Sequence, residues 1–328
     1  MNSSLILSRV PFRIPLGGGS TDMPSYYQKY GGFIFSAAIN MYMDVLIKQT
    51  RSDDLIHVHY KNFEAVPSID DIHHELARES LKMTGIKRGV AISFKADTPA
   101  GTGLGSSGAC IVALLKGLSA YKGNEMSNIE AAEKSFEITQ NLGLPDGKQD
   151  PYACAVGGFA VFDITQDGKV KITKPEIKKE TTDKFLKNSL LFYTGVSRES
   201  SPILAAQDKE KVLELKHETK KIGLAVYDSF LKEDLDRFGS LMDNHWKIKK
   251  AMSQQMSNKR FDDIYDAAKK AGALGGKIIG AGGGGYFLFY CPTEQIKESV
   301  RATLRPFMLR EVNFWIDEQG ARVKKLDF

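Results

Sequence analysis

A glycine-rich loop between an expected strand and an expected buried helix constrains this chain more than any other feature. Val90, Ile92 and Phe94 alternate with other residues at the period of a half-buried strand. Residues 106–120 are apolar nearly all round, as in a helix inside a protein, with Ser106 or Ser107 as its N-cap. The loop between them reads Pro99-Ala100-Gly101-Thr102-Gly103-Leu104-Gly105-Ser106-Ser107-Gly108-Ala109.

Such a loop is suited to binding phosphate groups. Its glycines let backbone N–H groups crowd around a polyanion, and the following helix presents unpaired N–H groups and a positive dipole end. Gly103, Gly105 and Gly108 also match the dinucleotide pattern GxGxxG, so an NAD-dependent oxidoreductase with a βαβ unit stays an alternative. The adjacent serines favour a nucleotide bound with Mg²⁺, and the absence of a following Gly-Lys-Ser/Thr excludes a Walker loop.

Two further glycine-rich segments flank this loop in the sequence. Near the N-terminus, Arg13 and Asp22 bracket a turn, where the carboxylate can hold sugar hydroxyls and the guanidinium can steady a carboxylate or a moving phosphoryl group. The turn itself reads Gly17-Gly18-Gly19-Ser20-Thr21. Near the C-terminus, residues 280–285 hold five glycines in six positions, which indicates that a ligand or another backbone approaches closely.

The chain predicts an α+β protein of two lobes. The Lys-rich, Pro-containing stretch 168–187 is typical of an edge strand plus linker, which divides the chain into residues 1–175 and 176–328. Extended segments are expected at 5–16, 45–48, 55–60, 90–94, 159–164, 190–193, 278–279 and 286–290. Helices are expected at 106–120, 127–143, 202–256 and 261–271.

Composition limits the partners. Lys and Arg number 45 against 40 Asp and Glu, and the resulting charge of +5 is not collected into one block, so anionic small molecules are favoured over nucleic acid. No apolar run reaches the roughly 20 residues that span a bilayer. The three cysteines lack metal-ligand spacing, so we expect buried thiols and a cytoplasmic protein. The oligomeric state is left open.

In their order along the chain, the three glycine-rich motifs resemble those of the GHMP kinases, which include galactokinase, homoserine kinase, mevalonate kinase and phosphomevalonate kinase. The resemblance spans residues 9–285. Within this superfamily, Arg9-Val10-Pro11-Phe12-Arg13, Gly17-Gly18-Gly19-Ser20-Thr21-Asp22-Met23-Pro24 and Gly147-Lys148-Gln149-Asp150 resemble the D-glycero-D-manno-heptose 7-phosphate kinase branch.

The resemblance implies a ribosomal-protein-S5-like N-terminal lobe and a ferredoxin-like C-terminal lobe, with ATP and acceptor meeting in the cleft between them. It implies that Asp150 is the catalytic aspartate and that Arg13 keeps it ionised and faces the moving phosphoryl group. It also implies that Ser107 contacts Mg²⁺. The residues expected to wrap the ATP phosphates are Gly101, Gly103, Leu104, Gly105, Ser106, Ser107 and Gly108.

Other roles rest on weaker matches. A second metal ligand falls by family register on Ile138 or Thr139, so the nearby Glu137 is the candidate, with Glu133 one turn before it. Lys148 and Arg198 are the cations expected to hold a phosphate of the acceptor. The remaining candidate contacts to the acceptor are Gly18, Gly19, Ser20, Thr21, Asp22, Gly282 and Gly283.

The expected activity is ATP-dependent phosphorylation of a sugar phosphate at its anomeric hydroxyl. The resemblance points to D-glycero-D-manno-heptose 7-phosphate, converted to the 1,7-bisphosphate for a nucleotide-activated heptose of surface polysaccharide. A galactose- or fucose-type sugar kinase is the main alternative. A non-catalytic sugar sensor is disfavoured, because a sensor has no need of Asp150 together with Arg13.

Overall fold

The computed structural model describes residues 5–198, 201–207 and 212–326. Its larger sheet is built around one long strand, β2 (Gly32–Gln49), which pairs along its length with β1 (Leu5–Gly17). The first part of β2 also pairs with β6 (Phe159–Ile164), and its last part pairs with β5 (Val90–Ala96). The other strands of this sheet are β3 (Ile56–His59), β4 (Phe63–Val66), β7 (Val170–Thr173) and β12 (Arg322–Leu326).

Helices pack beside this sheet, and two of them begin at expected motifs, one within the glycine-rich middle motif and one within the segment that holds Asp150. They are α2 (Glu75–Thr84), α3 (Ser106–Tyr121), α4 (Asn128–Asn141) and α5 (Gln149–Val156). Helix α3 is buried on nearly every side because alanine, leucine, isoleucine and valine occupy all its faces, as the sequence predicts. Helix α4 begins at Ser127, whose side chain accepts from the Glu130 N–H, so the predicted N-cap is confirmed.

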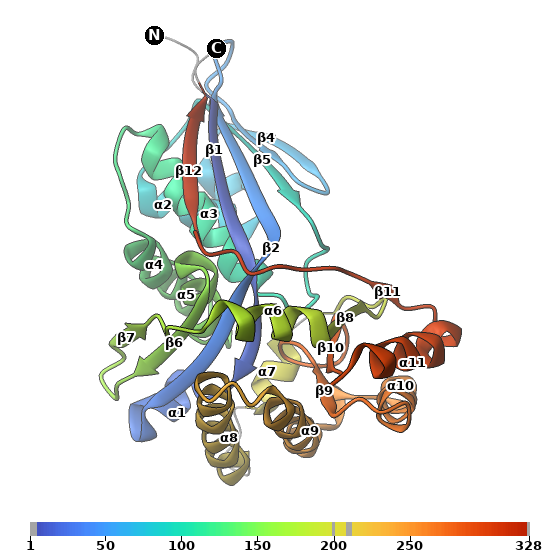
Figure 1. Ribbon diagram of the computed structural model, residues 1–328. Helices are drawn as coiled ribbons and strands as arrows, with labels where there is room; N and C mark the ends of the chain where they lie inside the picture. Colours follow the sequence, from blue (N-terminus) through green and yellow to red (C-terminus); the bar gives the residue numbers. More distant parts are fainter. Residues whose placement is uncertain (1–4, 199–200, 208–211, 327–328) are drawn as a thin grey trace.

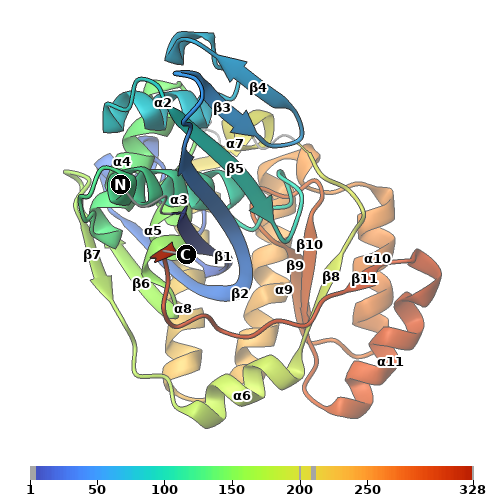
Figure 2. The ribbon, with the colours of Figure 1, turned by 90° about the horizontal axis from the view of Figure 1, so that it is seen from above.

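The smaller sheet is antiparallel, in the order β11 (Arg310–Glu311), β8 (Ser189–Tyr193), β10 (Tyr286–Tyr290) and β9 (Gly275–Ile278). Aromatic side chains of Trp246, Phe261 and Phe287 form the core between this sheet and its helices. Those helices include α9 (Leu235–Met252), α10 (Lys259–Lys270) and α11 (Glu294–Leu304), which lie on the side of the molecule away from α2, α3 and α4 (Figure 2). The shorter helices are α1 (Pro24–Tyr30), α6 (Lys179–Asn188) and α7 (Ser201–Gln207).

The two halves of the chain are interlocked. After β11 the chain crosses back and ends in β12, which pairs antiparallel with β1 in the larger sheet (Figure 1). Helix α8 (Leu213–Leu231) packs on β1 and β2, where Gly223 touches the backbone of Gly17. The expected division into residues 1–175 and 176–328 therefore needs correction for residues 322–326, which belong to the first sheet. The boundary near residue 175 stays a prediction.

Most expected elements are confirmed, and the differences have physical reasons. The strand expected at 45–48 is the end of β2, whose earlier part is buried on both faces and so lacks the alternation that marks a strand. Part of the expected linker is helix α6, which buries Phe185. Residues 208–211 of the expected helical stretch 202–256 lie outside the described residues. No described helix is long and apolar enough to cross a membrane.

Candidate active site

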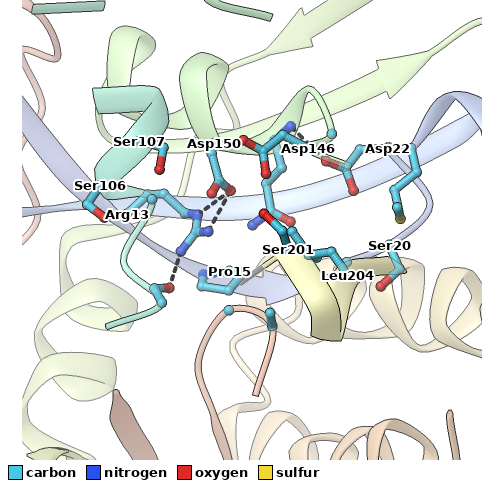
Figure 3. A pocket seen from close by; sticks show the side chains of 18 of the residues that line it. Arg13, Pro15, Ser20, Asp22, Ser106, Ser107, Asp146, Asp150, Ser201 and Leu204 are labelled. Carbon is cyan, nitrogen blue, oxygen red and sulfur yellow. Dashed lines mark hydrogen bonds and ion pairs between the residues drawn. The ribbon is translucent and has the colours of Figure 1, made fainter. Parts of the chain in front are cut away.

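A cavity of about 660 Å³ lies where the three glycine-rich segments meet. The first half of the chain contributes the end of β1, the loop before α3 and the start of α5. The second half contributes residues 197–198, α7, α8, α9, β9 and the loop after β9. Figure 3 shows the carboxylates of Asp22, Asp146 and Asp150 along one wall, with Ser201 and Leu204 of α7 opposite.

Arg13 and Asp150 form the central ion pair of this cavity. Both Nε and Nη2 of Arg13 donate to Oδ1 of Asp150, at 3.0 and 2.5 Å. Its Nη1 donates to the carbonyl of Gly103 at 2.6 Å (Figure 3). The arginine side chain is 4% exposed, whereas that of Asp150 is 38% exposed toward the cavity. One buried guanidinium thus links the predicted catalytic carboxylate to the predicted phosphate loop.

The middle and last glycine-rich segments touch each other backbone to backbone. Gly103 has a φ of +82°, and a Cβ there would lie 2.3 Å from the carbonyl oxygen of Ile279. A Cβ on Gly280 would lie 2.6 Å from Gly103 in turn. The sequence predicts that either a ligand or another backbone approaches residues 280–285 closely. At Gly280 the structure shows that the close neighbour is a backbone, that of Gly103 in the predicted phosphate loop.

The start of α3 is open to the cavity. Its N-cap is Gly105, which has no side chain to cap the first turn, so the expected capping by Ser106 or Ser107 is wrong. Both serines line the cavity instead. An uncapped N-terminus of a 16-residue helix offers N–H donors and a positive dipole end to an anion.

Asp22 and Asp146 add two carboxyl groups near Asp150. The Gln149 N–H donates to Oδ2 of Asp22 at 2.9 Å, which holds this carboxyl against the start of α5. Burial raises the pKa of Asp22, and the charge of Asp150 adds to the effect. Burial, with the charges of Asp150 and Asp22, raises the pKa of Asp146 to about 7. Sequence reasoning missed Asp146, because an aspartate before Gly147 is also what an ordinary turn requires.

Four basic groups from the second half of the chain line the cavity: Arg198, His245, Lys249 and Lys277. Arg198 donates through Nε to the Gly282 carbonyl at 2.5 Å, and burial lowers its pKa to about 10. Of the four, only Arg198 was a candidate from sequence. The sequence predicts His245 on an ordinary helical pattern, and the Met and aromatic residues around it indicate a packing face.

Several expected site residues lie elsewhere. Lys148 donates to both carboxylate oxygens of Glu133 at 2.9 and 2.8 Å and sits over the ring of Phe136. Together with Glu137 it lines a separate depression beside α4, so neither reaches the cavity as the sequence predicted. Others pack behind the cavity wall without lining it: Gly18, Thr21, Leu104, Gly108, Gly282 and Gly283. The cavity is lined by the remaining ones: Arg13, Gly19, Ser20, Asp22, Gly101, Gly103, Gly105, Ser106, Ser107, Asp150 and Arg198.

Comparison with known families identifies the class of protein. Residues 71–158 match the GHMP kinases N-terminal domain, and residues 226–308 match the GHMP kinases C-terminal domain. The chain belongs to the GHMP kinase family, which uses ATP as phosphate donor, and has the two-lobed α+β architecture expected from its motifs. The oxidoreductase alternative is wrong, because both matched domains are kinase domains. The expected βαβ unit is also not seen in the described residues: α4 and α5 follow α3, and the next strand, β6, pairs with β2 and β7 and not with β5.

Individual relatives are similar over nearly the whole chain. A D-glycero-alpha-D-manno-heptose 7-phosphate kinase of Campylobacter jejuni is 26% identical over 307 residues, covering 88% of this chain and 91% of that protein. A crystal structure of a D-glycero-D-manno-heptose 1-phosphate kinase from Bacteroides thetaiotaomicron is 25% identical, with a TM-score of 0.82 and coverage of 98% and 100%. An L-fucokinase/L-fucose-1-P guanylyltransferase of Bacteroides fragilis is 23% identical over 92% of this chain and 36% of that protein.

Proposed function

We propose that the protein transfers the γ-phosphoryl group of ATP to the anomeric hydroxyl of a phosphorylated sugar. D-glycero-D-manno-heptose 7-phosphate is the acceptor we favour, and its product is the 1,7-bisphosphate, a precursor of nucleotide-activated heptose for surface polysaccharide. The observation that carries the proposal is the Arg13–Asp150 pair held between the phosphate loop and the cavity. The names of the Campylobacter and Bacteroides heptose kinases support a phosphorylated heptose.

The chemistry assigned to the chain is mainly positioning, because phosphoryl transfer passes through a loose transition state. Asp150 orients the acceptor hydroxyl and takes its proton as the oxygen–phosphorus bond forms. The bond between the γ-phosphorus and the bridging oxygen breaks, and ADP leaves. Arg13 faces the moving phosphoryl group and holds Asp150 through two donors on one carboxylate oxygen. The loop at Gly101–Ser107 and the start of α3 receive the ATP phosphates.

The donors around the cavity fit Mg²⁺ bound together with ATP. The described residues contain no group of three or more His, Cys, Asp or Glu that could hold a metal by themselves. Magnesium is usually held by one or two carboxylates with substrate phosphates, so such a group is not required. Ser107 and Asp150 line the cavity, and Asp146 is available where Glu137 is not. When bound, the metal would neutralise charge on the phosphates.

A coupled ADP-release assay across an acceptor panel tests the proposal. The panel holds heptose 7-phosphate, heptose 1-phosphate, free heptose, galactose, fucose, mevalonate and homoserine, with Asp150→Asn as the background control. We expect heptose 7-phosphate to exceed free heptose by about a hundredfold or more in kcat/KM, because charge-assisted contacts to a phosphate strengthen binding by several kcal/mol. Preference for galactose or fucose would replace the acceptor and leave a sugar kinase. Preference for mevalonate or homoserine would refute the sugar assignment.

A further inference from the structure

The floor of the cavity carries buried ammonium groups without acidic partners. Lys249 on α9 is 8% exposed and Lys277 on β9 is 1% exposed, and both line the cavity. Among the described residues, neither lysine forms an ion pair with a carboxylate. Their close contacts are instead backbone carbonyls and one imidazole. Buried charges are normally paired, so this arrangement calls for an anion from outside the chain.

Two close contacts hold the side-chain nitrogen of each lysine in position. Lys249 donates to the carbonyl of Gly280 and lies 3.5 Å from that of Ile278. Lys277 donates to the carbonyl of Leu16 at 3.2 Å and lies 3.2 Å from Nδ1 of His245. In its charged form each lysine has three N–H donors, so each would keep one donor for a bound anion beyond these two contacts. The two lysines are thereby fixed in position for a ligand.

The local charges agree with a site for an anion. Burial lowers the pKa of Lys249 to about 7, and the positive charges of Arg198 and Arg13 add to the effect. Burial, together with Lys249 and Arg13, lowers the pKa of Lys277 well below its usual value. Burial and the positive charges of the two lysines also lower the pKa of His245 well below its usual value, and its Nδ1 lies 3.2 Å from Nζ of Lys277. A bound dianion would restore the charge on both lysines.

We propose that Lys249 and Lys277, with His245 beside them, form the subsite for the phosphate group that the acceptor already carries. The subsite rests on the proposed function and deepens it. The loop at residues 101–107 and the start of α3 already provide donors for the ATP phosphates. Lys277 contacts Leu16, next to the first glycine turn that leads to Asp22, the candidate contact to the sugar, so we assign this cation to the acceptor side. Of the two cations that the sequence predicts for this phosphate, Lys148 lies outside the cavity, whereas Arg198 lines it and donates through Nε to the Gly282 carbonyl.

Glutamine substitutions with a neighbouring lysine as matched control test the subsite. Lys249→Gln and Lys277→Gln remove the charge, whereas Lys250→Gln changes the next residue of α9, which pairs with Asp262 at 2.9 Å. We expect Lys249→Gln to reduce kcat/KM for the sugar phosphate by about 10- to 100-fold and to leave free sugar and the KM for ATP nearly unchanged. Lys250→Gln should leave all three values at wild-type level.

Two outcomes would overturn the assignment. An equal loss on phosphorylated and free sugar, with a raised KM for ATP, would assign the lysines to the transferred phosphoryl group. An unchanged preference for the sugar phosphate in both variants would remove the lysines from recognition. The melting temperature is measured alongside, and Lys249→Arg keeps the charge, so partial rescue by arginine separates a phosphate contact from a folding defect.

A binding experiment keeps the subsite testable if the acceptor itself is wrong. Inorganic phosphate is titrated by calorimetry into protein saturated with a non-hydrolysable ATP analogue, which occupies the nucleotide phosphate site. Binding to the wild type and to Lys250→Gln, with loss in Lys249→Gln, supports the subsite even when no sugar in the panel is phosphorylated. Equal phosphate binding by all three proteins would overturn the subsite while leaving the kinase assignment intact.

Discussion

Asp150→Asn separates the chemical step from nucleotide binding. Both contacts from Arg13 end on Oδ1 of Asp150, and asparagine keeps an oxygen that can accept them. The variant therefore changes the charge and the ability to take a proton, with little change in shape. Arg13 still donates to Gly103, so the phosphate loop keeps its anchor.

The expected magnitude follows from these contacts. A general base contributes roughly 100- to 10,000-fold in rate, so turnover should fall at least about 100-fold, which corresponds to about 2.7 kcal/mol of activation free energy. Hydrogen bonds to charged groups are worth roughly 1.5–3 kcal/mol against about 1 for neutral ones. Because Asp150 is 38% exposed, the loss of folding stability should be about 1 kcal/mol or less.

The assay combines steady-state ADP release with calorimetric binding of a non-hydrolysable ATP analogue. We expect lower kcat, a nearly level KM for ATP and unchanged analogue affinity. Arg13→Lys and the double variant complete a cycle, and because the two side chains act as one unit, the double variant should be little worse than the worse single one. Near-normal turnover in Asp150→Asn would remove this carboxylate from the mechanism, and a parallel loss of ATP affinity would make its role structural.

Three further predictions test the loop, the metal and the floor of the cavity. Gly103→Ala should lower the free energy of unfolding, measured by urea denaturation, by more than about 2 kcal/mol. The control Gly123→Ala should lower it by less, because Gly123 has a similar φ but no atom within 4 Å of the new methyl group. Ser107→Ala should reduce the thermal stabilisation by ATP that depends on Mg²⁺ and leave the metal-independent part, whereas a larger shift with NAD than with ATP would contradict the nucleotide site. Because the pKa of Lys249 is lowered to about 7 and a phosphate requires its charged form, kcat/KM for the sugar phosphate should fall by up to about tenfold per pH unit above pH 7. Arg198 and Arg13 act on the pKa of Lys249, and the other titratable groups of the same cavity are Lys277, His245, Asp22, Asp146 and Asp150. An unchanged pH profile in Lys249→Arg would contradict the titration of Lys249 as the cause.

The sequence predicts best those parts of the site that are encoded locally. The phosphate loop and α3 lie within one continuous stretch, where glycine spacing and a run of apolar residues decide the structure. The pairing of Arg13 with Asp150, 137 positions apart, was predicted only through the resemblance to a family. Periodicity alone gives no information about a contact over that separation.

Local patterns fail where a contact between distant segments decides the role of a residue. Lys277 meets Leu16 across 261 positions, and nothing near either residue marks the contact. Lys148 lies next to the predicted catalytic segment in the sequence. Its ammonium group nevertheless points outside the cavity, because it pairs with Glu133 on α4 and lies over the ring of Phe136. For a lysine, packing against distant elements determines whether the charge reaches a ligand or a neighbouring carboxylate.

The contacts that join the two halves of the chain fix the position of the proposed phosphate subsite relative to Asp150. Asp150 stands on an element of the first half, and Lys249 and Lys277 stand on α9 and β9 of the second. Between the halves, Gly103 and Gly280 touch backbone to backbone, and β12 ties the end of the chain to β1. Backbone contacts of this kind hold the two halves in a fixed position relative to each other. The separation between the aspartate and the proposed phosphate subsite is thus a property of the fold. If the proposed subsite holds the acceptor phosphate, a sugar is selected by where its phosphate stands relative to the reacting hydroxyl, in addition to its hydroxyl pattern.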